Sequence, residues 1–144
     1  MKPYILTAVI IAAIAAGGWL AMQPKSGTEA EAATPTQGDP IVSITLPKSL
    51  SAQARMGERA FNATCVACHG ANATGKAGFG PPLVHKIYEP SHHGDMAFLA
   101  AAQIGVRAHH WRFGNMPPQE GLTRADTANI VTYVRELQRA NGIN

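Results

Sequence analysis

The sequence contains only two cysteines among its 144 residues, so it cannot form a framework of several disulfides. It has no internal repeat and no strand-rich pattern, which leaves helices as the elements that its apolar periods support. It also lacks any run of basic residues. From position 40 onward, ten Lys and Arg stand against six Asp and Glu, a net charge of +4. This charge is too weak and dispersed to indicate nucleic-acid binding, but it could steer docking onto an acidic protein surface.

The first 22 residues combine a positive charge with a long apolar run. Lys2 precedes an uncharged stretch from Tyr4 to Met22, which as a helix would be about 28 Å long and could cross a bilayer. We therefore predict a transmembrane anchor over residues 1–22, with Lys2 holding the N-terminus in the cytoplasm. The alternative is a cleaved signal peptide ending near Ala32, although the apolar run is longer than signal peptides usually have. Both interpretations place the rest of the chain on the periplasmic side of the cytoplasmic membrane.

Two further parts follow this run. Residues 23–40 are rich in Ala, Thr, Gly, Pro and Glu without an apolar period, which predicts a flexible linker. Residues 41–144 are long enough for one small domain, and residues 41–46 at its start alternate weakly, as a short strand or extended chain would. A domain of this size commonly needs a disulfide, a metal or a cofactor to complete its core.

Three segments of the domain predict helices, and loops rich in Gly and Pro join them. The first helix is capped by Ser51 and covers Ala52 to about Ala63. The second covers about Asp95 to Gly105. The third follows Thr123, which begins a sequence resembling a capping box, and we expect it to stop near Gly142. The predicted fold class is therefore mostly α.

The two cysteines belong to the sequence Cys65-Val66-Ala67-Cys68-His69. Each thiol at this spacing can add to one vinyl group of haem, and the imidazole that follows can bind the iron. A zinc site and a thioredoxin-like disulfide are the alternatives. Zinc usually takes four ligands, yet the sequence has no third cysteine, and a redox disulfide needs a βαβ context that the helical periods do not offer. Two free thiols outside the cytoplasm would also be exposed to oxidation unless they are bound covalently to haem.

With this motif the sequence resembles the class I, monohaem c-type cytochromes of the membrane-anchored bacterial type, over about Ser51 to Leu137. The resemblance implies a small cytochrome c fold of about three helices around one haem. In that family a glycine and an aromatic residue of the N-terminal helix pack against the C-terminal helix. Gly57 and Phe61 correspond to that pair, and the implied partners are Ile130, Tyr133 and Leu137.

The resemblance also implies the residues around the iron. Gly80-Pro81-Pro82-Leu83 matches a family turn whose proline carbonyl, here that of Pro81, accepts a hydrogen bond from the ligand histidine His69. Met116, in a loop before the last helix, matches the family's methionine ligand, and its neutral thioether would stabilise ferrous iron. The alternatives are that Met116 only packs, with His109 or His110 as the ligand. Met56 and Met96, on helix faces, are expected to be core residues.

Five histidines have no role in that pattern: His85, His92, His93, His109 and His110. Surface positions are the simpler interpretation, whereas a second metal site or a pH-sensitive patch near the haem edge is the alternative. Arg107, Trp111 and Arg112 lie where the family commonly places a hydrogen-bond donor toward a haem propionate, and the sequence does not distinguish among them.

The resulting functional hypothesis is a single-electron carrier with one haem c, not an enzyme, anchored at the periplasmic face of the cytoplasmic membrane. The implied partners are a quinol:cytochrome c reductase and a terminal oxidase or reductase. Two alternatives stay open, a haem-bearing subunit of a larger membrane oxidoreductase complex and an open-site haem protein that binds gas or peroxide.

Overall fold

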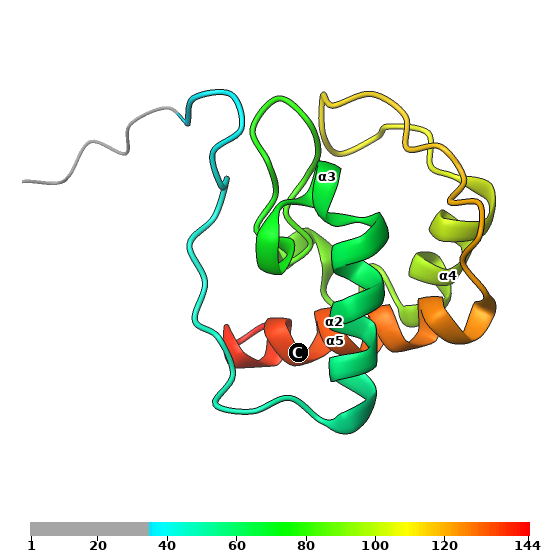
Figure 1. Cartoon of the computed structure of the whole chain (residues 1–144). Coiled ribbons are helices and arrows are strands. Elements are labelled where there is room, and N and C mark those ends of the chain that lie inside the picture. Colours follow the sequence, from blue (N-terminus) through cyan, green and yellow to red (C-terminus); the bar gives the residue numbers. More distant parts are fainter. Residues whose placement is uncertain (1–34) are drawn as a thin grey trace, which may run out of the picture. The chain divides into compact units, whose positions relative to one another are not determined.

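The computed structural model describes residues 35–144 (Figure 1). The anchor predicted over residues 1–22 and most of the linker predicted over residues 23–40 lie outside this range. Between residues 35 and 144, no helix has both the length and the apolar character needed to cross a bilayer.

Helices dominate the described residues, in agreement with the mostly α prediction. They are α2 (Ala52–Thr64), α3 (Val66–His69), α4 (Asp95–Ile104) and α5 (Arg124–Ala140), with short 3₁₀ helices at Ala71–Ala73 and Lys86–Tyr88. Over the same residues, β pairing is confined to two isolated bridges, Lys76 with Gly80 and Val106 with Met116. The weakly alternating residues 41–46 are extended chain without a strand partner.

Capping side chains define where the long helices begin. Ser51 Oγ accepts a hydrogen bond from the Ala54 amide at 3.0 Å, and α2 starts at the next residue as predicted. Thr123 and Asp126 form the complete capping box of α5. This helix stops at Gly142 as predicted: Asn141 is its C-cap, and Gly142 follows in the left-handed conformation with φ of +72°, its amide donating to the Arg139 carbonyl oxygen. The Asn141 side chain also pairs with the main chain of Thr45 at 2.7 and 2.8 Å.

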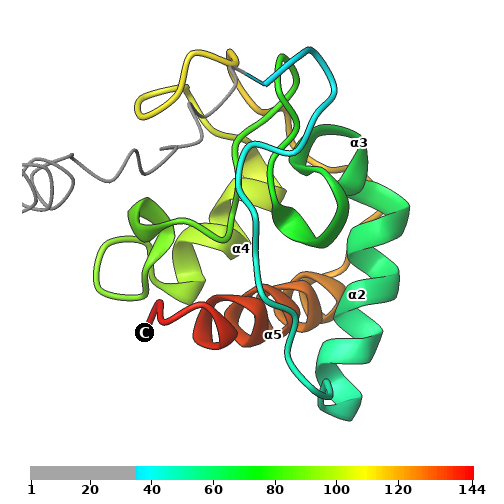
Figure 2. The same cartoon turned by 90° about the vertical axis from the view of Figure 1, so that its left-hand side faces the viewer.

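The core lies where α2 crosses α5 (Figures 1 and 2). A Cβ atom on Gly57 would lie 1.9 Å from the Asn129 carbonyl oxygen, so only glycine permits this approach. One turn along, the rings of Phe61 and Tyr133 meet at a centroid distance of 5.7 Å. The contact of Phe61 with Tyr133, and the approach of Gly57 to the Ile130 main chain, are contacts that the family resemblance implied. The buried apolar cluster comprises Ala54, Phe61, Ala73, Val84, Ile130, Tyr133, Val134 and Leu137.

Replacing Gly57 by alanine should lower the free energy of unfolding by about 3 kcal/mol, because the added methyl group must push two helix backbones apart. Gly94→Ala is the matched control, since its Cβ would meet only the Pro90 carbonyl oxygen, at 3.6 Å. Denaturant unfolding followed by far-ultraviolet circular dichroism measures both variants. Equal stability of the two variants would show that the helices can separate without cost.

The expectation that Met56 and Met96 are core residues is wrong. Met56 is 45% exposed and Met96 is 63% exposed. The buried stripe of α2 consists of Ala54, Gly57 and Phe61, spaced at three and four residues, and Met56 lies outside it. In α4 only Ala102 is buried.

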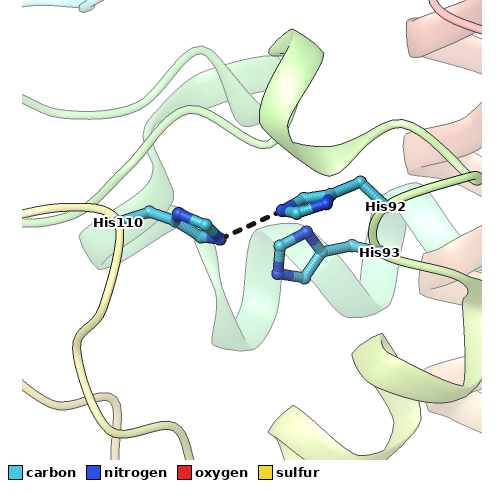
Figure 3. Close-up of side chains that lie close together, drawn as sticks. All are labelled: His92, His93 and His110. Carbon is cyan, nitrogen blue, oxygen red and sulfur yellow. Dashed lines mark hydrogen bonds between the residues drawn. The ribbon is translucent and has the colours of Figure 1, made fainter.

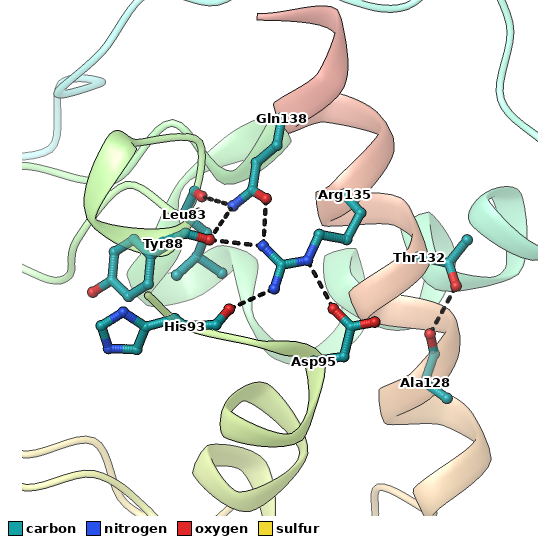
Figure 4. A network of polar contacts seen from close by, with 8 residues as sticks. All are labelled: Leu83, Tyr88, His93, Asp95, Ala128, Thr132, Arg135 and Gln138. Carbon is teal, nitrogen blue, oxygen red and sulfur yellow. Dashed lines mark hydrogen bonds and ion pairs between the residues drawn. The ribbon is translucent and has the colours of Figure 1, made fainter. Parts of the chain in front are cut away.

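Arg135, a buried residue of α5, ties that helix to the chain before α4 (Figure 4). Its guanidinium donates to Asp95 Oδ1 at 2.8 Å and to the carbonyl oxygens of Tyr88 at 2.7 Å and His93 at 2.5 Å. Gln138 extends the network, since its amide donates to the carbonyl oxygens of Leu83 and Tyr88. The buried charge is therefore paired and hydrogen-bonded, and it holds residues 83–93 in place.

The extended segment before α2 packs along one side of the domain (Figure 2). Gly38 and Asp39 pair through their main chains with Ala77, with both N···O distances at 2.9 Å. The amides of Ile41 and Val42 both donate to the Thr74 carbonyl oxygen. These contacts join the last residues of the predicted linker to the loop that follows α3.

Candidate functional site

The two cysteines lie where α2 passes into α3. The Cys65 amide donates to the Phe61 carbonyl oxygen at 2.7 Å, and the His69 amide donates to the Cys65 carbonyl oxygen at 2.9 Å, so the motif is wound into one compact turn. Cys65 is half-buried and Cys68 is exposed. Burial, with a smaller contribution from Cys68, raises the pKa of the Cys65 thiol to about 11. A thioredoxin-like redox cysteine needs a lowered pKa, so the site does not suit that chemistry.

His69 ends α3 as a buried, neutral imidazole. Burial lowers its pKa and outweighs the opposite effect of the hydrogen bond to Pro81. That bond joins His69 Nδ1 to the Pro81 carbonyl oxygen at 2.8 Å, and because a carbonyl can only accept, Nδ1 carries the hydrogen. The Nε2 lone pair is thereby left for a metal, the arrangement that an oriented histidine ligand requires.

Gly80 allows the Pro81 turn to lie against the motif. A Cβ atom at this position would be 2.7 Å from the Cys68 carbonyl oxygen, closer than such contacts occur in proteins. The contact between Pro81 and His69 therefore depends on Gly80, which the family resemblance indicates only as part of a turn.

Met116 lies at the end of a loop whose two ends are joined by main-chain hydrogen bonds. Val106 and Met116 exchange both main-chain hydrogen bonds, at 2.9 and 3.0 Å, and the Ala108 amide donates to Asn115 Oδ1 at 2.9 Å. Gly105, with φ of +77°, ends α4 and starts this loop. Residues 106–116 thus form a loop whose ends are fixed beside α4, with the Met116 side chain half-buried.

One cavity brings the predicted site residues together. It has a volume of about 690 Å³ and is lined by Cys65, Cys68, His69, Pro81 and Met116, which belong to three separate segments. Residues that the sequence had not connected with the site complete the walls, among them Tyr88, Phe113 and Leu122. Helix α4 also contributes to the cavity walls, with Phe98 and Ala101 among its lining residues. The apolar period of this helix is the sequence feature that could have indicated this contribution.

These residues fit a haem. The cavity combines apolar walls with two thiols, an imidazole and a thioether. Trp111 also lines it, and its buried Nε1 has no hydrogen-bond partner; the nearby Tyr88 hydroxyl does not reach hydrogen-bond geometry with it. An indole N–H left in this way can donate to a propionate carboxylate. Arg107 and Arg112, the other two candidates, are exposed.

Comparison with protein families agrees with this geometry. Residues 54–138, more than half of the chain, match the model of the family described as cytochrome c. The match includes both cysteines, His69, Pro81 and Met116. Proteins of this family carry covalently attached haem c with its iron, and they function in haem-based electron transfer. The fold, the cavity and the family match lead to one conclusion: the chain belongs to the cytochrome c family.

Proposed function

We propose that the chain is a single-electron carrier in which His69 and Met116 would hold the iron of the bound haem. The observation that carries this proposal is that both side chains line one cavity with Cys65 and Cys68. When bound, the haem supplies an iron that alternates between ferric and ferrous states. If His69 and Met116 both bound the iron, they would leave no position on it for a substrate, and the neutral sulfur of Met116 would favour the ferrous form.

The competing ligands, His109 and His110, are turned toward other groups. His109 Nδ1 lies 2.8 Å from the Arg107 carbonyl oxygen, and His110 Nε2 lies 3.3 Å from His92 Nε2. Both histidines are exposed, whereas Met116 is half-buried. These contacts favour Met116 as the sixth ligand.

Two further residues support the iron site in this proposal. Pro81 fixes the tautomer and ring orientation of His69 through the 2.8 Å hydrogen bond. Trp111 binds a haem propionate through its otherwise unpartnered Nε1.

The proposed setting is the periplasmic face of the cytoplasmic membrane, with residues 1–22 as an anchor and, as a tether, the part of the predicted linker that precedes Gly38, since Gly38 and Asp39 pair with Ala77 of the domain. A tether keeps the domain close to membrane complexes and raises its effective concentration there. The proposed donor is a quinol:cytochrome c reductase, and the acceptor is a terminal oxidase or reductase. The net charge of +4 from position 40 onward supports docking on an acidic face of these partners.

Membrane fractionation tests the carrier and its location together. Expressed in a bacterium with a quinol-oxidising respiratory chain, the haem-stained protein should stay with the membranes after salt washing and separate from the larger complexes in mild detergent. In these membranes quinol should reduce it and oxygen should reoxidise it, at rates that fall as salt screens the docking charges. Haem stain in the soluble fraction would contradict the anchor, and a haem that exchanges no electrons would contradict the carrier.

A further inference from the structure

Four histidines from two separate segments lie together beside the haem cavity, and three of them, His93, His109 and His110, line it. His92 and His93 lie in the turn before α4, and His109 and His110 lie in residues 106–116. His92 Nε2 and His110 Nε2 are 3.3 Å apart (Figure 3). One ring nitrogen from each of His92, His93 and His110 lies within 4.8 Å of the other two.

This spacing suits a small metal ion. Zinc–nitrogen bonds of about 2.0–2.1 Å in a tetrahedron separate the ligand nitrogens by about 3.3 Å, which is the separation between His92 and His110. His93 lies close to both, with ring centroids 4.7 Å from His92 and 5.2 Å from His110. Small side-chain rotations would bring the third nitrogen to bonding distance.

A hydrogen bond orients the His93 ring, as is common for histidines that bind a metal. Its Nδ1 lies 2.8 Å from the Ile87 carbonyl oxygen, so Nδ1 carries the hydrogen and the Nε2 lone pair is free. Its own carbonyl oxygen accepts a hydrogen bond from Arg135. Ring and main chain are thus both anchored by groups outside the cluster.

The two segments that supply the histidines are also positioned independently of any metal. The amides of His92 and His93 donate to the Glu89 carbonyl oxygen at 3.0 and 2.8 Å. The hydrogen bonds between Val106 and Met116 close the loop that carries His110. The ligands therefore need little reordering to bind an ion.

The donor set selects the class of metal. The two carboxylates of the segment that carries His92 and His93 are engaged elsewhere, since Glu89 pairs with Lys86 and Asp95 with Arg135. Imidazoles without carboxylates suit copper and zinc and do not suit magnesium or calcium, which prefer oxygen ligands. Among divalent first-row ions, nitrogen sites bind Cu²⁺ most tightly.

We propose that His92, His93 and His110 bind one divalent transition-metal ion, with Cu²⁺ held more tightly than Zn²⁺ and a solvent molecule completing the coordination. His92 and His110 are exposed, so the ion would be exchangeable. This site is distinct from the haem iron, and its existence does not depend on electron transfer by the haem.

The test uses the full-length, haem-loaded protein, stripped with a chelator and titrated with Cu²⁺ or Zn²⁺ in a calorimeter. We expect one copper per haem, weaker binding of zinc, and copper affinity lowered at least about tenfold in His92→Ala and in His110→Ala. The electron paramagnetic resonance spectrum of the copper should show coupling to nitrogen nuclei. Unchanged Soret absorption and circular dichroism in both variants establish that they are folded.

His85→Asn is the matched control. His85 lies outside the cluster and caps the 3₁₀ helix Lys86–Tyr88 through its ring nitrogen, and asparagine keeps a side-chain acceptor there. This variant should bind copper as the wild type does. The proposal is overturned if the wild type binds no copper, or if the double variant His92→Ala/His110→Ala binds as much copper as the wild type with the same affinity.

Discussion

Replacing Cys65 and Cys68 together by serine should abolish covalent haem attachment completely. The hydroxyl of serine is nearly the size of the thiol but does not add to a haem vinyl group, so only the chemistry of attachment is removed. Haem staining after a denaturing gel should be lost, and the intact mass should be that of the bare polypeptide. Each single variant keeps one thiol and should keep part of the stain.

The double variant should also lose cooperative unfolding. A cavity of about 690 Å³ is large for a domain of this size, and without the haem its walls have no partner atoms. Denaturant titration followed by circular dichroism measures this loss. The Met116→Ala variant is the control, because its two thiols are intact and it should retain the full haem stain. Stain persisting in the double variant would contradict attachment at these cysteines.

Replacing Met116 by alanine should open the iron without unfolding the domain. The hydrogen bonds between Met116 and Val106 use main-chain atoms, so the loop keeps its closure. The ferric protein should lose the weak red absorption band that a methionine sulfur on haem iron produces. The ferrous protein should change from binding no carbon monoxide to binding one molecule per haem, and the reduction potential should fall.

Met96→Ala provides the comparison for this variant. Met96 is 63% exposed on α4 and does not line the cavity, so its removal should change none of these spectra. If Met116→Ala had the wild-type spectrum, the sixth ligand would be another residue. His110→Ala would then be the next variant to measure, because His110 also lines the cavity.

The long helices could be predicted from the sequence because their signals are local. Ser51 and Thr123 cap the helices that follow them, and the observed starts agree with the predicted ones. Gly142 likewise stops α5 as predicted, because it lies just beyond the C-cap Asn141 with φ of +72°. The exposure of side chains was harder to predict. Met96 is apolar in a helix and still exposed, because the neighbours of a helix decide which face is buried.

The part of the candidate site that lies in sequence motifs could be predicted. The spacing of Cys65, Cys68 and His69 by itself predicts haem attachment and an iron ligand. Pro81 and Met116 are identified only through the family resemblance. The five unassigned histidines suggest a second metal site only as an alternative, and the sequence does not say which of them meet, since 17 positions separate His93 from His110 and only the packing of two irregular segments brings them together. The network at Arg135, which holds one of these segments, is likewise a product of tertiary packing.

The most direct test of a closed iron centre is the absorption spectrum of the purified wild-type protein, in the ferric state and in the ferrous state under carbon monoxide. With His69 and Met116 as ligands, the ferric protein should show the red sulfur-to-iron band, and the ferrous spectrum should not respond to carbon monoxide. A ferric spectrum without that band, together with rapid carbon monoxide binding, would contradict the closed centre and with it the assignment of Met116.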